Sequence, residues 1–167
     1  MEEREVVPVD GRLRLRAFAG EQDVAVALPW YADPATVVAV DGPGATPYDV
    51  ARVAAMYDAL DTQGDLYMIE ERAQSGWAPV GDVTLAPDTL PIVVAPGHRR
   101  RGIGRAVLLR LVDRARVLGW EELRVREVHP ESAASQALFE GLGFVPRADA
   151  PPAYVLPLSP LVVRRRG

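Results

Sequence analysis

Several residue types are missing from this sequence, and each absence narrows the chemistry that the chain can perform. Cysteine is absent, which excludes a disulfide framework, a thiolate metal site and a cysteine nucleophile. Lysine is absent too, so all 19 basic residues are arginine. A single arginine is therefore a weak sign of a binding site here, and a P-loop, which needs a lysine after its last glycine, is excluded.

Long apolar runs and an excess of positive charge are lacking as well. No run approaches the roughly 20 apolar residues that span a bilayer, and the acidic start MEEREVVPVDG lacks the apolar core of a secretion signal. The formal charge is −4 at pH 7, whereas nucleic acids and anionic membranes bind broad basic surfaces. We expect a cytoplasmic protein with no nucleic-acid partner, no membrane partner and no metal site.

The residues that are present can build one sizeable core, because 49% of the 167 residues are hydrophobic. No internal repeat or long linker divides the chain. We therefore predict one domain over residues 1–167, with its core at about 12–160, a short N-terminal tail and an arginine-rich C-terminal tail.

The periodicity of apolar residues predicts a mixture of strands and helices, which defines an α+β fold. Turn-forming residues and the short spacing between strands favour an antiparallel meander in the middle of the chain. Strands are expected over residues 13–18, 36–40, 66–71, 79–85, 89–95, 122–128, near 144 and over 154–158. Helices are expected over residues 21–32, 49–60, 103–118 and 132–141.

The segment VAPGHRRRGIGR, residues 94–105, carries the strongest functional signal. It joins a strand to a long helix, an arrangement that aims backbone N–H groups and the positive helix end at an anion. Gly102 and Gly104 remove Cβ atoms where a ligand must approach the main chain, and guanidinium groups suit phosphate oxygens. The alternative is a solvated turn in an arginine-biased chain. A dinucleotide fingerprint does not fit, since it needs three glycines in a parallel βαβ unit.

Two motifs together resemble the GCN5-related N-acetyltransferase (GNAT) family over nearly the whole chain. Arg99, Gly102 and Gly104 match the family's Gln/Arg-x-x-Gly-x-Gly/Ala signature, and HPESAASQALFEGLGF, residues 129–144, resembles its later motif. The resemblance implies a mostly antiparallel sheet of six to seven strands, flanked by helices and with splayed central strands. It also implies acetyl-CoA as the cofactor and a fold whose members often form homodimers.

The resemblance further implies which residues contact the cofactor. Main-chain groups of Ile92, Val93 and Val94 would meet the pantetheine arm, and the amides of residues 99–105 would hold the pyrophosphate, with one or more arginine side chains closing over it. Which arginine does so stays open. The cofactor-binding set implied in this way is Ile92, Val93, Val94, Arg99, Arg100, Arg101, Gly102, Ile103, Gly104, Arg105, Ser132 and Phe139.

Two positions depart from the family pattern. Phe139 stands where many members carry a tyrosine that protonates the departing thiolate, so a tyrosine acid at that site is excluded. Ser132 stands where an asparagine is common, and its hydroxyl could contact the cofactor or only cap the following helix.

Attack of an amine on a thioester needs a group that takes a proton. Asp82 and Glu127 are the predicted catalytic residues, although spacing alone does not separate them from Glu70 and His129. For each carboxylate the alternative is an ion pair with one of the many arginines, and a water chain could replace a dedicated base.

The segment LPWYADP, residues 28–34, is the predicted acceptor site. Trp30 and Tyr31 could wall a pocket and Asp33 could hold a cationic amine, although packing in the core is the alternative for both aromatic residues. The resulting hypothesis is acetyl transfer from acetyl-CoA to a primary amine of a small molecule, such as an amino sugar or another cationic amine. Its alternatives are a peptide N-terminal acetyltransferase, an acyl-CoA-binding sensor without turnover, and a binding module for another phosphate compound.

Overall fold

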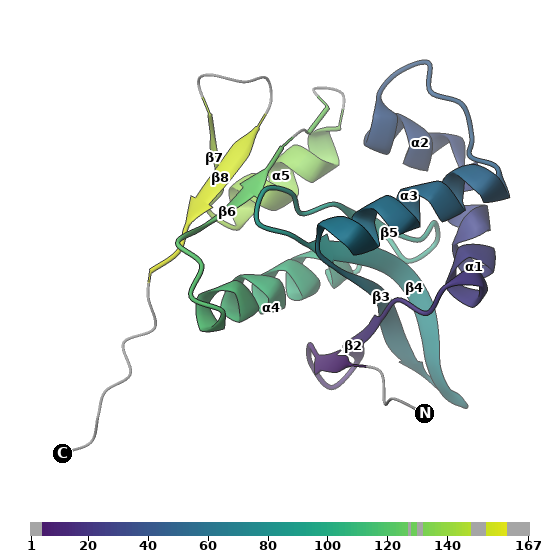
Figure 1. Cartoon of the computed structure of the whole chain (residues 1–167), viewed down its shortest axis with the longest axis horizontal. Coiled ribbons are helices and arrows are strands. Elements are labelled where there is room, and N and C mark those ends of the chain that lie inside the picture. The colour runs from purple at the N-terminus through teal and green to yellow at the C-terminus, as the bar shows by residue number, and fades with distance from the viewer. Residues whose placement is uncertain (1–4, 127, 130–131, 148–152, 160–167) are drawn as a thin grey trace.

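The structure is a computed structural model that describes residues 5–126, 128–129, 132–147 and 153–159. Two strands and three helices come first, and three more strands precede the long fourth helix, as Figure 1 shows. The elements are β1 (Val6–Pro8), β2 (Leu13–Ala17), α1 (Glu21–Ala32), α2 (Pro34–Asp41), α3 (Val50–Gln63), β3 (Asp65–Ala73), β4 (Gly76–Leu85), β5 (Ile92–Val94), α4 (Ile103–Val117), β6 (Glu122–Val125), α5 (Ala133–Gly141), β7 (Val145–Pro146) and β8 (Tyr154–Pro157).

The strands form two antiparallel sheets. Five strands pair in the order β1-β2-β3-β4-β5, and three pair in the order β6-β8-β7. Within the described residues β5 pairs with β4 alone and β6 with β8 alone, so no strand pairing joins the two sheets. The α+β class and the mostly antiparallel pairing are confirmed, but the strands are divided between two sheets and do not form one sheet of six to seven.

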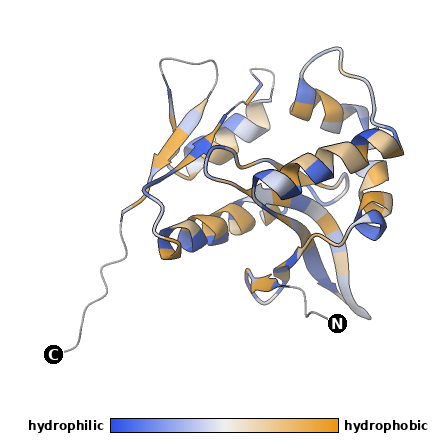
Figure 2. Ribbon diagram, in the orientation of Figure 1, coloured by the Kyte–Doolittle hydropathy of each residue, from blue (hydrophilic) through white to orange (hydrophobic). Residues whose placement is uncertain are grey.

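Helices cover both faces of the larger sheet, and each face has its own apolar core. Leu15, Ile69 and Val83 pack with Leu108 of α4 and belong to one core. Met68 packs in the other core with residues of α1 and α3, among them Tyr31 and Tyr57. Figure 2 shows apolar and polar residues mixed along the helices. In α4 the buried residues Ile103, Val107, Leu108, Leu111, Val112 and Ala115 recur at the spacing of a helix that packs on a sheet. No helix in the described ranges has the length and apolar character required to traverse a bilayer.

One predicted strand is a helix. Residues 36–40 were expected to be extended because they are rich in valine, but they lie in α2. The Asp33 side chain caps this helix by accepting a hydrogen bond from the Thr36 amide at 3.0 Å, and Pro34 occupies its first turn. Val37 is fully buried. The cap and this burial outweigh the β-propensity of the segment.

The other differences lie at strand ends. Strand β5 covers residues 92–94 of the predicted 89–95, and β6 covers residues 122–125 of the predicted 122–128. The short strand β1 was not predicted; it pairs along the edge of β2. The helices over residues 21–32, 49–60, 103–118 and 132–141 are confirmed within one to three residues at each end.

Candidate active site

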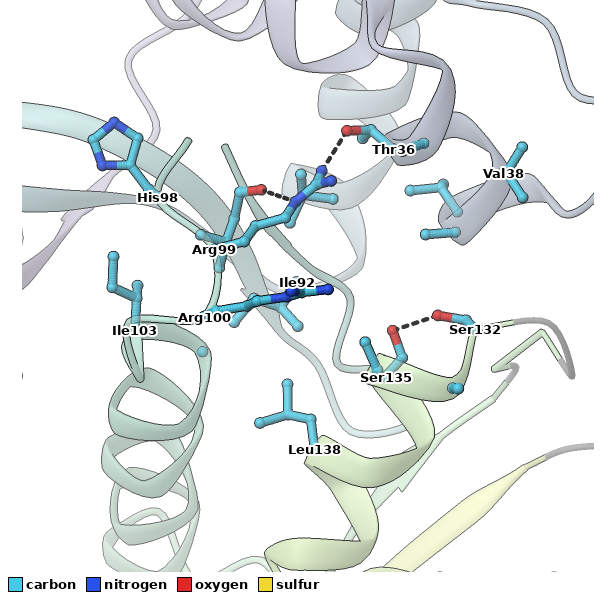
Figure 3. A pocket seen from close by; sticks show the side chains of 18 of the residues that line it. Thr36, Val38, Ile92, His98, Arg99, Arg100, Ile103, Ser132, Ser135 and Leu138 are labelled. Atoms are coloured by element: carbon cyan, nitrogen blue, oxygen red, sulfur yellow. Dashed lines mark hydrogen bonds between the residues drawn. The ribbon is translucent and has the colours of Figure 1, made fainter. Parts of the chain in front are cut away.

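A cleft of about 1030 Å³ opens between the edge strand β5 of the larger sheet and the helices α2 and α5. Its walls come from α2, β5, the loop before α4, the first turn of α4 and the start of α5 (Figure 3). The motifs at residues 94–105 and 129–144, which are distant in sequence, therefore face each other across a single space.

The loop that ends at α4 is shaped by backbone conformations that favour glycine. Gly97 has φ 87° and Gly102 has φ 77°, and Arg100 adopts φ 61° although it carries a side chain. Ala106 donates the first intrahelical bond of α4, to the Gly102 carbonyl at 3.1 Å. The amides of residues 103–105 therefore have no acceptor within the helix and are free to bind an anion.

Gly104 is needed for a different reason. A Cβ atom at this position would lie 3.3 Å from Cδ2 of Leu138 on α5. The missing side chain thus lets α4 and α5 approach each other at the floor of the cleft.

The three consecutive arginines of the loop have different partners. Arg99 turns toward α2, where its guanidinium donates to the Thr36 hydroxyl at 2.5 Å, and it also donates to the Val94 carbonyl at 3.1 Å. Arg101 pairs with Glu71 at 3.0 Å, outside the cleft. Arg100 extends into the cleft beneath Arg99 (Figure 3), and within the described residues no carboxylate pairs with it. Arg100 is thus the guanidinium of the three that is available to a ligand in the cleft.

The opposite wall presents hydroxyl groups. Ser132 precedes α5, but its side chain makes no capping bond and instead donates to the Ser135 hydroxyl at 2.8 Å. Both serines line the cleft. The side-chain cap considered for Ser132 is therefore not formed, whereas a contact of its hydroxyl with a ligand stays a prediction.

A smaller cavity of about 140 Å³ adjoins the cleft. It shares Ala39, Val40, Ile92, Val93 and Ser135 with the cleft. Its other lining residues are Tyr31, Met56, Leu60, Asp82, Thr89, Leu90, Pro91, Val125, Val128 and Phe139.

Asp82 is the buried acid of this cavity. It lies on β4 opposite Val93 and is 2% exposed. The hydroxyls of Tyr31 and Tyr57 both donate to its Oδ2, at 2.8 and 2.7 Å. Since both donors use Oδ2, the other oxygen, Oδ1, accepts no hydrogen bond from the described residues.

Burial raises the pKa of Asp82 from 3.8 to about 6, because desolvation disfavours the charged form more than the hydrogen bonds from Tyr57 and Tyr31 favour it. The same burial, together with the Asp82 charge, raises the pKa of the Tyr31 hydroxyl far above its ordinary value. Near neutral pH the site thus combines a carboxylate that can accept a proton with two phenols that remain protonated.

The other groups considered as a base lie elsewhere. Glu70 is buried but bound to Arg14 at 2.9 Å and Arg16 at 3.3 Å, the ion-pair arrangement that was the alternative for each carboxylate. The His129 ring contacts the Val40 carbonyl at 3.0 Å through Nε2, and His129 does not line the cavity. Glu127 lies outside the described residues. No group of three or more histidine and acidic side chains in the described ranges could hold a metal ion.

The structure separates the three residues of the predicted acceptor segment. Tyr31 reaches the cavity and holds Asp82. Trp30 packs in the core formed by α1 and α3 and lines neither space. Asp33 caps α2 and lies 3.8 Å from Arg99.

Sequence reasoning did not identify Tyr57 or Thr36 as parts of the site. Tyr57 was considered only as an apolar residue at helical spacing on α3, and a buried tyrosine needs a hydrogen-bond partner, which is the signal that could have identified it. Thr36 was assigned to a strand. The structure shows it on α2, holding Arg99.

Comparison with known proteins agrees with this geometry. Residues 12–145 match the acetyltransferase (GNAT) domain. Over 86 residues the chain is 37% identical to the [ribosomal protein bS18]-alanine N-acetyltransferase of Escherichia coli K12, an alignment that covers 49% of this chain and 57% of that protein. The chain thus spans little more than half the length of this curated relative. An L-methionine sulfoximine/L-methionine sulfone acetyltransferase of Salmonella typhimurium is 38% identical over 60 residues, which are 36% of this chain and 34% of the relative.

Solved structures show the same fold. A domain from Methanocaldococcus jannaschii superimposes with a TM-score of 0.77 at 16% identity, over 89% of this chain and all of that chain. A spermidine N-acetyltransferase from Vibrio cholerae, in complex with CoA and spermine, gives a TM-score of 0.66 at 21% identity over 83% of each chain. Because the domain match covers most of the residues and confirms the resemblance of the two motifs, this chain belongs to the GNAT acetyltransferase family.

Proposed function

We propose that the protein transfers the acetyl group of acetyl-CoA to a primary amine of a small molecule. The observation that carries this proposal is the wall shared by two neighbouring spaces of different chemistry. An anion-binding cleft and a cavity that holds a buried carboxylate share Ile92, Val93 and Ser135. An acyl donor in the cleft and an amine beside Asp82 would therefore meet at β5.

Coenzyme A fits the residues of the cleft. The amides of residues 103–105 and the guanidinium of Arg100 would hold the pyrophosphate, since they are the unpaired donors at the start of α4. The backbone edge of β5 that does not pair with β4 would lie along the pantetheine arm. The cofactor would supply an activated acetyl thioester at the inner end of this path.

Asp82 would take the proton from the attacking amine. As the bond from nitrogen to the acetyl carbon forms, the nitrogen becomes much more acidic, and a carboxylate whose pKa is about 6 can then accept its proton. Tyr31 and Tyr57 hold Oδ2, so Oδ1 would be the accepting oxygen. Cleavage of the carbon–sulfur bond would release the cofactor as a thiolate, with the amine proton held by Asp82.

Phe139 cannot protonate the departing sulfur. Its ring is buried against Phe144, with 5.3 Å between the ring centroids, and it has no exchangeable proton. Because thiols have a pKa near 8.5, a thiolate is an adequate leaving group near neutral pH. We propose that it leaves without an acid at this position and takes its proton from solvent.

The test measures thiol release from acetyl-CoA with amines of several classes, alongside calorimetry of acetyl-CoA binding. Turnover with a small primary amine, lost on Asp82→Asn with acetyl-CoA binding retained, is the expected result. Binding without turnover of any amine would favour the sensor alternative. Turnover confined to peptides would favour N-terminal acetylation, the activity in the name of the ribosomal-protein relative.

A further inference from the structure

The charge of the inner cavity restricts which amines can enter it. Among the described residues that line the cavity, Asp82 is the one residue with a carboxylic acid, and no arginine or histidine is present. The Tyr31 hydroxyl already donates to Asp82. An ammonium group is therefore stabilised beside Oδ1, whereas a carboxylate on the same molecule would lie near Asp82 without a cation to pair with it.

The neighbouring cations are engaged elsewhere. Arg126 follows Val125, which lines the cavity, but the Arg126 guanidinium pairs with Asp88 on the surface. Arg99 is bound to Thr36 and to the Val94 carbonyl. Neither guanidinium is directed at an acceptor beside Asp82, so the site lacks the group with which enzymes usually bind the carboxylate of an amino acid.

The walls and the volume of the cavity restrict the body of the acceptor. Apart from Asp82, Tyr31, Thr89 and Ser135, the described lining is apolar and comes from α2, α3, β5, β6, α5 and two loops. Its volume of about 140 Å³ resembles that of a cavity that accommodates one benzene molecule, about 150 Å³. With the acetyl group held on the cleft side of β5, the buried part of the acceptor is limited to about six heavy atoms.

The cavity combines the Asp82 carboxylate with apolar walls, a small volume and no cation among its described lining residues. We therefore propose that the natural acceptor is a compact, apolar monoamine without a carboxylate, the class represented by branched alkylamines of about five carbon atoms. The inference rests on the proposed function and narrows it. It disfavours amino sugars and polyamines, whose additional polar or charged groups would find no partner among the apolar walls.

A series of acceptors with the same carbon skeleton tests the proposal on the full-length chain. Isoamylamine, L-leucinamide and L-leucine share one side chain and differ in one substituent on the carbon that bears the amine. This substituent is a hydrogen in isoamylamine, a neutral amide in L-leucinamide and a carboxylate in L-leucine. We expect kcat/KM to be highest for isoamylamine and at least about 100-fold lower for L-leucine. Putrescine and an alanyl peptide complete the series. Equal or higher kcat/KM for L-leucine, putrescine or the peptide would overturn the inference.

A substitution at the cavity mouth tests the electrostatic argument directly. Met56 on α3 lines the cavity and is half-buried, so a longer polar side chain there can keep its head group near solvent. Met56→Arg should raise kcat/KM for L-leucine relative to isoamylamine at least tenfold, while the neutral control Met56→Gln should leave the ratio within about threefold of wild type. If Met56→Arg is folded and leaves the ratio unchanged, the missing cation does not determine specificity.

The failure of this inference differs from the failure of the proposed function. If the enzyme acetylates L-leucine or the peptide best, acetyl transfer stands and the acceptor class is wrong. If acetyl-CoA binds but neither these five amines nor any other amine class of the thiol-release assay is acetylated, acetyl transfer itself is wrong.

Discussion

Replacement of Asp82 by asparagine should change the pH dependence of stability in a defined direction. Asparagine keeps the size of the side chain and an oxygen that accepts hydrogen bonds from Tyr31 and Tyr57, but it removes the titrating group. In the folded protein the pKa of Asp82 is raised from 3.8 to about 6. The unfolded chain therefore binds fewer protons than the folded chain between these values, and the carboxylate makes folding less favourable as pH rises.

The size of the effect follows from the shift. Above pH 6, where Asp82 is charged in both the folded and the unfolded state, a pKa difference of about two units lowers the free energy of unfolding by about 3 kcal/mol. Well below about pH 4 the group is protonated in both states, and the free energy of unfolding is not lowered. Between pH 4.5 and 7, the free energy of unfolding of the wild type minus that of Asp82→Asn should fall by about 2 kcal/mol.

Urea unfolding of both proteins at several pH values measures this difference. Asp58→Asn is the matched control, because Asp58 is an exposed carboxylate on α3, and it should not alter the pH dependence by more than about 0.5 kcal/mol. If the stability curves of wild type and Asp82→Asn stay parallel from pH 4.5 to 7, the raised pKa, and with it the argument that Asp82 is a base poised near neutrality, is refuted.

The same variant has a kinetic consequence. Loss of a general base lowers rate by about 10²- to 10⁴-fold, so kcat/KM of Asp82→Asn should fall by that factor while its Kd for acetyl-CoA stays close to that of the wild type. In the wild type, kcat/KM should decrease below about pH 6 as Asp82 takes up a proton. An unchanged kcat/KM in the variant would assign the proton transfer to another group.

Three further predictions concern the cleft and the sheet. Gly102→Glu should weaken acetyl-CoA binding at least about 100-fold in calorimetry, because it places negative charge at the helix end, and unchanged affinity would show that the loop does not bind the cofactor. Arg100→Ala should weaken it about 10- to 100-fold and Arg101→Ala less than about threefold; the reverse order would contradict the assignment of the arginines. Gly81→Ala should destabilise the fold by about 1–3 kcal/mol in urea unfolding, because its Cβ would lie 2.3 Å from the Val93 carbonyl oxygen. Gly11→Ala, whose Cβ meets no atom within 4 Å, is the near-neutral control.

Local features of the chain were predictable from sequence because their causes are local. The period of apolar residues in 103–118 specifies α4, and Gly102, with φ 77°, specifies the turn before it. The helix capped by Asp49 was also predicted, with its side chain accepting from the Arg52 amide at 2.9 Å. Segment 36–40 was not, because its residues favour a strand and only the Asp33 cap and burial against α1 and α3 make it helical.

The sequence by itself determined the family and the position of the glycine loop before α4, because both depend on short motifs with fixed spacing. Only the tertiary structure decided how the side chains of that loop are placed. The three loop arginines are equivalent in sequence, but Glu71 binds one, Thr36 another, and Arg100 alone of the three extends unpaired into the cleft. Likewise, Asp82 and Glu70 are both carboxylates on strands. Asp82 is hydrogen-bonded by two tyrosines from distant helices beside the cavity, whereas Glu70 forms an ion pair with Arg14. Hydrogen bonding and desolvation depend on what surrounds a side chain in space, and distant residues supply those surroundings only after folding.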